Sequence, residues 1–155
     1  MFFCLIFLGW GLSGCRSKES SVKKKHVLEG LDRRTKLRFK SYFAKGHVLY
    51  QRHCSNCHQS SGKGIKSWIP PLKNSDYLLR NPKRNICIIR YGQDSIIRVN
   101  GKKYDSPMPG FPQLSSLEIA EIITYVQNAW GNRGGFLSVK EVQMYLERDS
   151  CRVRF

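Results

Sequence analysis

Acidic residues are scarce in this sequence. Its 155 residues include 11 Asp and Glu against 27 Lys and Arg, which gives a formal net charge of +16 at pH 7. A chain with so little negative charge is poorly suited to cationic partners. Its positive excess favours acidic ones, such as nucleic acid, anionic lipid or an acidic protein surface. The length suits one domain with appendages.

The sequence also lacks an apolar run long enough to cross a bilayer. The run over residues 1–14 is shorter than the roughly 20 residues that a spanning helix needs, so we interpret it as an export signal. It ends in Leu12-Ser13-Gly14-Cys15, which resembles the lipobox of bacterial lipoprotein signal peptides, although no Lys or Arg precedes it. The resemblance implies that Cys15 is acylated and becomes the new N-terminus. The alternative is an uncleaved anchor.

Closely spaced pairs of metal ligands are missing too, with one exception. Cys54 and Cys57 stand three positions apart, directly before His58. Because no second pair exists, a four-ligand zinc site is disfavoured. A thioredoxin-like redox site is disfavoured as well, because the motif has neither a strand before it nor a βαβ pattern around it. The spacing instead predicts the covalent attachment of a c-type haem.

Each residue of this motif has a separate role in haem attachment. Residues i and i+3 lie on one face of a helix, which suits two thioether bonds to the same edge of a porphyrin. The neutral imidazole of His58 can then bind the iron from the proximal side. A single covalent haem would also supply much of the core of a chain with a modest apolar fraction.

The segment 15–38 is rich in Lys, Arg and Ser and has no sustained apolar periodicity. We therefore expect a lipidated N-terminus followed by a basic linker. A nucleic-acid-binding arm is the alternative, and the expected export of the chain argues against it. Binding of this segment to anionic headgroups stays open.

Apolar periodicity begins at Phe39 and predicts a helix that runs to the haem motif. Residues 75–91 predict two short helices broken at Pro82, because proline cannot occupy a helix interior. Residues 92–113 predict a long loop, which in a compact domain usually has a function. An amphipathic helix with a serine N-cap is expected to follow at about residue 115.

The last segment, residues 133–155, is a C-terminal extension whose role the sequence does not indicate. It contains the run LSVKEVQMYL, which predicts another short helix. Cys87 and Cys151 could form a disulfide in an oxidising compartment, but the sequence does not give the distance between them.

Residues 39–132 resemble the class I cytochromes c, in particular the small monohaem bacterial domains. The elements that carry the resemblance occur in the family's order: Cys54–His58, Pro70-Pro71-Leu72, Val99–Tyr104, Met108-Pro109 and Tyr125–Asn132. The resemblance implies an all-α fold of three to five helices around one haem c. It also implies that the first and last helices cross at right angles around Gly46, Tyr50 and Tyr125, and that a carbonyl near Pro70 or Pro71 orients His58.

The sixth iron ligand is predicted to be Met108. It lies between two prolines in the long loop, where a stiff backbone would hold the thioether, and a soft sulfur donor raises the reduction potential. Met144 is interpreted as a packing residue of the C-terminal helix. The remaining histidines are interpreted as surface groups or as neighbours of the site: His26, His47 and His53.

Together these features predict a membrane-tethered monohaem cytochrome c that carries single electrons between respiratory proteins and catalyses no reaction. Its expected partners are the membrane, through Cys15, and redox proteins with an acidic docking face, such as a terminal oxidase or reductase. Nucleic acid is not among them. The expected location is the periplasmic side of the bacterial cell envelope. The alternatives are a haem-bearing subunit of a larger oxidoreductase (an oxidase, nitrite reductase or dehydrogenase) and a haem-based ligand sensor.

Overall fold

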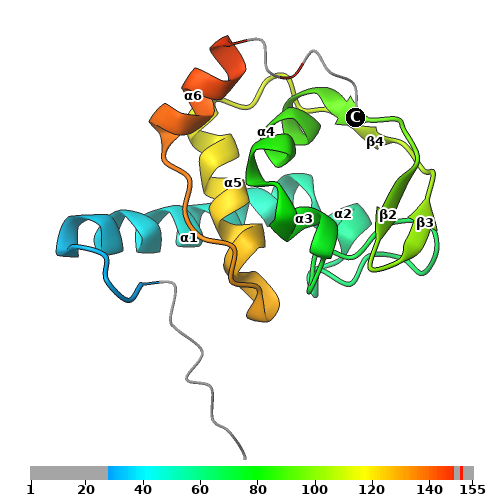
Figure 1. The fold of residues 1–155 in the computed structure, drawn as a ribbon, viewed down its shortest axis with the longest axis horizontal. Coiled ribbons are helices and arrows are strands. Elements are labelled where there is room, and N and C mark those ends of the chain that lie inside the picture. Colours follow the sequence, from blue (N-terminus) through cyan, green and yellow to red (C-terminus); the bar gives the residue numbers. More distant parts are fainter. Residues whose placement is uncertain (1–27, 149–150, 152–155) are drawn as a thin grey trace, which may run out of the picture.

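A computed structural model describes residues 28–148 and Cys151, and Figure 1 shows its fold. Within these residues the chain forms six α-helices, one short 3-10 helix and four short strands. The predicted all-α architecture is confirmed. The helices outnumber the three to five expected because one is a single turn at the haem motif and another lies in the C-terminal extension.

Helix α1 (Arg33–His53) begins within the segment predicted as a linker. Its N-cap is Asp32, whose carboxylate accepts hydrogen bonds from the backbone N–H of Thr35 at 3.0 Å and from its hydroxyl at 2.6 Å. Most side chains of the first turns are exposed, which explains why apolar periodicity did not reveal them. The buried face of α1 consists of Phe39, Tyr42, Gly46, Leu49 and Tyr50.

Helix α5 (Ser116–Asn128) packs across α1, and the two helices form the centre of the fold (Figure 1). The closest approach is at Gly46, where an added Cβ atom would lie 2.0 Å from the backbone oxygen of Glu121. The rings of Tyr50 and Tyr125 lie 5.3 Å apart beside it. The predicted crossing around Gly46, Tyr50 and Tyr125 is therefore confirmed.

Three short helices separate α1 from α5 along the sequence: α2 (Ser55–His58), α3 (Asp76–Arg80) and α4 (Pro82–Tyr91). The predicted break at Pro82 is confirmed, because Pro82 starts α4. Asn81 caps that helix, and its side-chain oxygen accepts from the backbone N–H of Arg84 at 3.0 Å. Proline suits this position because the first helical N–H has no intrahelical partner.

The prediction of an irregular loop over residues 92–113 is wrong, because the segment contains two antiparallel pairs of strands. They are β1 (Gly92–Gln93) with β4 (Met108–Pro109), and β2 (Ile97–Val99) with β3 (Lys102–Tyr104). Strands of two or three residues are too short to show an alternating pattern. The turn Asn100-Gly101, with φ angles of 50° and 79°, is the type of signal that favours a hairpin.

The C-terminal extension packs onto the domain. Its helix α6 (Val139–Glu147) lies against α4 and α5, and Val142 is fully buried there. The ring of Phe136 packs 5.2 Å from that of Tyr42. Met144 is 37% exposed, so Val142 supplies the packing that was predicted for Met144.

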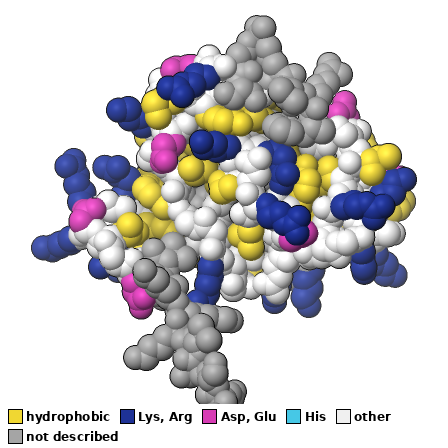
Figure 2. All heavy atoms as spheres, in the orientation of Figure 1, with side chains coloured by type: hydrophobic (Ala, Val, Ile, Leu, Met, Phe, Trp, Pro, Cys, Tyr) yellow, Lys and Arg dark blue, Asp and Glu magenta, His cyan; other side chains and the backbone are white. Residues whose placement is uncertain are grey.

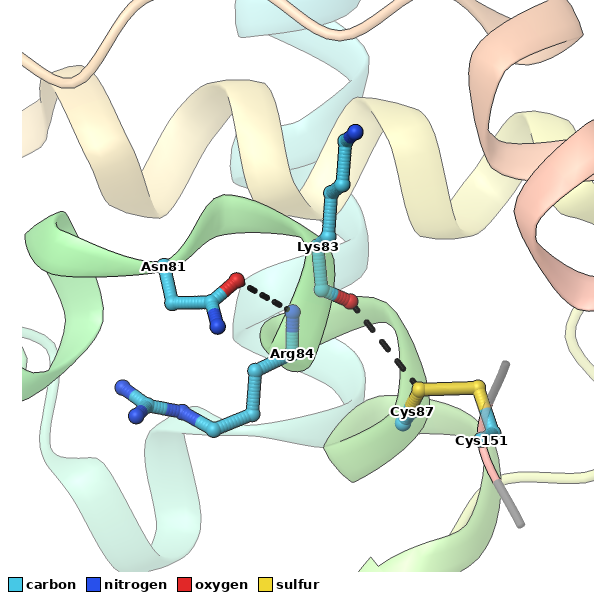
Figure 3. The surroundings of a disulfide bond; sticks show 5 residues. All are labelled: Asn81, Lys83, Arg84, Cys87 and Cys151. Carbon is cyan, nitrogen blue, oxygen red and sulfur yellow. Dashed lines mark hydrogen bonds between the residues drawn. A yellow bond between two sulfur atoms is a disulfide. The ribbon is translucent and has the colours of Figure 1, made fainter. Parts of the chain in front are cut away.

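A disulfide between Cys87 of α4 and Cys151 ties the end of the extension to the domain (Figure 3). The two residues are 64 positions apart in the sequence. Closing so long a loop restricts the unfolded chain, and such bonds persist in oxidising compartments.

No helix in the described part of the chain is long and apolar enough to cross a membrane. The predicted signal segment, Cys15 and His26 lie outside the described residues.

Candidate haem-binding site

The Cys54–His58 motif begins where α1 ends. The backbone N–H of Cys54 donates to the Tyr50 carbonyl at 2.9 Å, and the Cys54 carbonyl accepts from the N–H groups of Cys57 and His58 at 3.2 and 2.9 Å. The motif is therefore one helical turn, which is the local structure that thiols at i and i+3 need for a shared face. Both thiols are free of disulfides.

Two observations argue against the alternative interpretations of this motif. Burial raises the pKa of Cys54 to about 12, and the neighbouring Cys57 adds to the effect. A redox-active cysteine instead has a lowered pKa. Among the described residues, no group of three or more His, Cys, Asp or Glu side chains is placed to hold a metal ion, whereas a zinc site needs four ligands.

His58 is buried and its ring orientation is held by the backbone. Its Nδ1 lies 3.1 Å from the carbonyl oxygen of Pro70, and because a carbonyl can only accept, Nδ1 carries the proton. The other nitrogen, Nε2, is left as the one that can bind iron. Burial lowers the pKa of His58, and the hydrogen bond to Pro70 opposes this in part. The imidazole is therefore neutral at pH 7, which is its ligating form.

A tight loop, residues 62–73, brings Pro70 to His58 and is called the Pro70 loop. Gly62 anchors it, because its carbonyl accepts from the N–H groups of Leu72 at 2.8 Å and Lys73 at 2.9 Å. Gly64 has a φ of +66°, and a Cβ atom there would lie 2.2 Å from the carbonyl oxygen of Ile69. Glycine is thus needed both for the backbone angle and for the close approach.

Cys54, Cys57, His58 and Met108 all line one cavity. The space between its walls measures about 1000 Å³, including the part open to solvent, which is at the upper end of the usual range for ligand sites. Most of the other lining residues are apolar and come from the Pro70 loop, α3, α4, the β2–β3 hairpin and α5. They include Ile69, Pro71, Leu72, Leu78, Ile88, Ile89, Ile97, Val99, Ile122 and Val126.

Met108 reaches the cavity from strand β4, where it pairs with Gln93 of β1. Just beyond it, the N–H of Phe111 donates to the Ile89 carbonyl at 2.8 Å, so the backbone on both sides of Met108 is held. Its role as the sixth ligand stays a prediction.

The other candidate side chains lie elsewhere. Met144 is on α6, and neither His47 nor His53 lines the cavity. The ring of His47 packs 5.1 Å from Tyr125, and that of His53 packs 5.7 Å from Phe111.

Asn132 organises the wall beside His58. Its Oδ1 accepts from the N–H of Asn74 at 2.7 Å, and its Nδ2 donates to the carbonyls of Leu72 and Val126 at 2.9 and 2.8 Å. Asn132 belongs to one of the elements that carry the resemblance, but the sequence did not predict its hydrogen bonds. Hydrogen bonds between distant segments leave no periodic pattern in a sequence.

The hydrogen bonds between Asp76 and Asn100 were not predicted, although Asn100 lies in one of the elements that carry the resemblance. The N–H of Asn100 donates to the Asp76 carboxylate at 2.7 Å, and the N–H of Asp76 donates to the Asn100 side chain at 3.1 Å. These bonds join the start of α3 to the turn of the β2–β3 hairpin, and the Asn100 bond holds the pKa of Asp76 below its usual value. The available signals were Ser75 as the N-cap of a short helix and Asn100-Gly101 as a hairpin turn.

The residues present fit a covalently attached haem. The chain offers two thiols on one helical turn, a neutral imidazole with a fixed tautomer, a thioether and apolar walls around a common space. A c-type haem is attached through two thiols, and imidazole and thioether groups can bind its iron.

We predict that the haem stays with the protein during acid-acetone extraction, because thioether bonds are covalent. Replacing both Cys54 and Cys57 by alanine should make any bound haem extractable, as measured by the absorbance of the two phases. The matched control replaces Cys87 and Cys151 by serine, which removes the disulfide and should leave the haem attached. Extraction of haem from the unmodified protein, or zinc in its place, would contradict the assignment.

The comparisons with known proteins agree with this geometry. The family model described as "Cytochrome c" matches residues 43–130. The chain is 36% identical over 93 residues to "Cytochrome c-552" of Thermus thermophilus, a match that covers 57% of this chain and 70% of that protein. It is 32% identical over 106 residues to the "Fructose dehydrogenase cytochrome subunit" of Gluconobacter japonicus, covering 63% of this chain but 21% of that subunit.

A third relative is the cytochrome c subunit of the quinone-dependent alcohol dehydrogenase of Gluconacetobacter polyoxogenes. The identity is 28% over 90 residues, which is 57% of this chain and 19% of the subunit. The chain therefore spans only about a fifth of each dehydrogenase subunit.

Proposed function

The chain belongs to the cytochrome c family, which binds haem c covalently and carries electrons, and we propose that it does so while tethered to a membrane between respiratory proteins. The observation that supports haem binding is the common cavity lined by Cys54, Cys57, His58 and Met108. When bound, haem c supplies a one-electron couple. His58 and Met108 would hold it through the imidazole and the thioether. If both bind the iron, a substrate would have no access to it.

The proposed location is the periplasmic side of the bacterial cell envelope, with acylated Cys15 in a membrane. The lipobox-like ending of the apolar run supports this placement. The Cys87–Cys151 disulfide supports it independently, since such bonds are typical of oxidising compartments.

We predict that Cys15→Ser abolishes incorporation of labelled palmitate and either releases the protein from membranes or leaves an unprocessed precursor. The physical reason is that stable anchoring needs more than one acyl chain, and all of them would depend on this cysteine. Fractionation and radiolabelling measure both effects, and Cys4→Ser, which lies before the predicted cleavage site, is the control. Label that persists without Cys15 would show the assignment to be wrong.

The proposed partner is a redox protein with an acidic docking face. Lys63 and Lys66 flank Ile65 in the exposed part of the Pro70 loop, and Trp68 in the same loop is 72% exposed. Ile69 and Pro70, which follow directly, line the cavity. This loop thus combines positive charge with exposed apolar surface next to the cavity. Apolar centres with charged rims are typical of protein interfaces.

We predict that electron transfer to an acidic partner slows markedly as ionic strength rises from 0.01 to 0.1 M. The Debye length falls from about 30 to about 10 Å over this range, which weakens electrostatic steering. Lys63→Glu with Lys66→Glu should reduce the dependence on salt. The control is Lys140→Glu with Arg148→Glu on and just after α6, a charge change of equal size. A rate that is flat or rises with salt in stopped-flow measurements would contradict an acidic partner.

A second candidate function is that of a haem subunit of a larger oxidoreductase. The relatives named as cytochrome subunits of alcohol and fructose dehydrogenases favour it. Isolation of the native membrane complex distinguishes the two functions, because a catalytic subunit that co-purifies in fixed proportion would support the subunit.

A further inference from the structure

Helix α1 has an unusual charge distribution. It contains no Asp or Glu, and its basic residues are Arg33, Arg34, Lys36, Arg38, Lys40, Lys45 and Arg52. Lys45 lies 3.9 Å from Glu121, and the others form no ion pair with any residue in the described part of the chain. Two of these cations, Arg33 and Arg34, occupy the first turn, where the helix dipole disfavours positive charge. Asp32 at the N-cap, Glu118 near Arg52 and Glu121 near Lys45 offset only part of this charge.

The outward face of α1 is also partly apolar. Leu37, Ala44 and Val48 follow the spacing that places side chains on one face of a helix, and all three are exposed, Leu37 and Val48 to 58% each. The basic residues lie on both sides of this stripe: Arg34, Arg38, Lys45 and Arg52 on one side, and Arg33, Lys36 and Lys40 on the other. An apolar stripe between two basic rows is the pattern of a helix that lies in a membrane interface.

The position of α1 in the fold suits this role. Its N-terminal end projects from the body of the protein (Figure 1), and Figure 2 shows Lys and Arg side chains gathered around that end. None of the described residues that line the cavity belongs to α1. A partner surface that binds to α1 would therefore not contact the residues that line the cavity through this helix. The predicted tether at Cys15 would also enter the domain at this end of α1.

We propose that the outward face of α1, formed by Leu37, Ala44, Val48 and the flanking Lys and Arg residues, binds the surface of anionic phospholipid bilayers. The basic rows would contact the headgroups, and the apolar stripe would enter the boundary with the acyl chains. An acidic protein could use the charge, but the apolar stripe extends along the helix axis, which suits a flat surface. The proposal goes beyond a lipid tether, since it concerns the orientation of the domain and does not require acylation of Cys15.

The test uses a haem-loaded protein that begins at Leu28. This protein contains the whole described part of the chain, and it lacks both Cys15 and the basic segment before α1. Its circular dichroism and haem absorbance are first compared with those of the full chain to establish that it has the same fold. Its sedimentation with phosphatidylcholine vesicles is compared with that on vesicles that also contain phosphatidylglycerol. We expect binding at least tenfold tighter to the anionic vesicles, with binding that weakens but does not vanish as salt is raised.

Two variants separate the contributions of charge and apolar contact. Arg33→Glu with Arg34→Glu should weaken binding more than tenfold, at about fivefold for each basic residue lost. Acidic residues in the first turn favour the helix, so unfolding of α1 would not explain the loss. Leu37→Asn with Val48→Asn should weaken the binding that persists at high salt. The matched control is Lys102→Glu with Lys103→Glu on β3, which changes the charge equally outside α1 and should bind like the unmodified protein.

Several results would overturn the proposal. Equal binding to neutral and anionic vesicles, or equal losses in the α1 and β3 charge variants, would show that the face of α1 has no specific role. If the protein does not bind vesicles, while the Arg33 and Arg34 variant slows electron transfer to an acidic partner, the face belongs to a protein interface. Haem retention and the reduction potential should be unchanged in the α1 variants, which keeps this test separate from that of the proposed electron carrier.

Discussion

Replacement of Met108 by alanine is expected to lower the reduction potential of the haem by on the order of 100 mV or more. A thioether is a soft donor that favours ferrous iron. Among the described residues, the only other sulfur atoms on the cavity wall are those of Cys54 and Cys57, which are predicted to attach the haem. The weak near-infrared band of ferric iron with histidine and methionine ligands should disappear as well. Potentiometric titration followed by absorbance measures both effects in one experiment.

Met144→Ala is the matched control. Met144 lies on α6, is 37% exposed and does not line the cavity, so its loss should change neither the band nor the potential. If Met108→Ala leaves both unchanged, the ligand assignment is wrong. If the unmodified reduced protein binds carbon monoxide at neutral pH, the distal position is open and the ligand sensor becomes the better interpretation.

Gly46→Ala is expected to destabilise the fold by at least about 3 kcal/mol. The added Cβ atom would lie 2.0 Å from the Glu121 carbonyl oxygen and 2.8 Å from the Cβ atom of Tyr125. The first contact is with backbone, so no side-chain rotation can relieve it, and α1 and α5 must move apart. The expected result is a large fall in the midpoint of guanidinium unfolding, with the haem as the spectroscopic probe.

The control for Gly46 is Ser41→Ala on the same helix. Ser41 is exposed, so the substitution tests helix propensity alone and should stabilise α1 slightly. Propensity by itself would also favour alanine over glycine at position 46, by about 1 kcal/mol. Helix propensity therefore predicts that Gly46→Ala raises the free energy of unfolding, whereas the steric clash predicts that it lowers this free energy. A Gly46→Ala protein as stable as the original would mean that the helices do not approach as closely as described.

The features that the sequence predicted best are those that depend on neighbouring residues. A helix boundary at Pro82 follows from the missing N–H of proline, and the haem motif follows from the chemistry of three neighbouring residues. The start of α1 at Arg33 was missed because its exposed first turns leave no apolar pattern. The strands around Met108 were missed because they are only two or three residues long, and their pairing joins positions separated by the intervening hairpin.

The sequence by itself determined which residues could attach a haem and which methionine could complete its ligands, since these depend on residue type and local position. The all-α class followed from the resemblance to the class I cytochromes c. The tertiary structure alone decided which distant groups meet. It selected the carbonyl of Pro70, out of the two predicted near Pro70 or Pro71, as the partner of His58. It also placed Asn132 on the loop beside His58, and it brought Cys151 within bonding distance of Cys87. Hydrogen bonds and disulfides of this kind depend on how the backbone returns on itself, and that path is set by packing across the whole core.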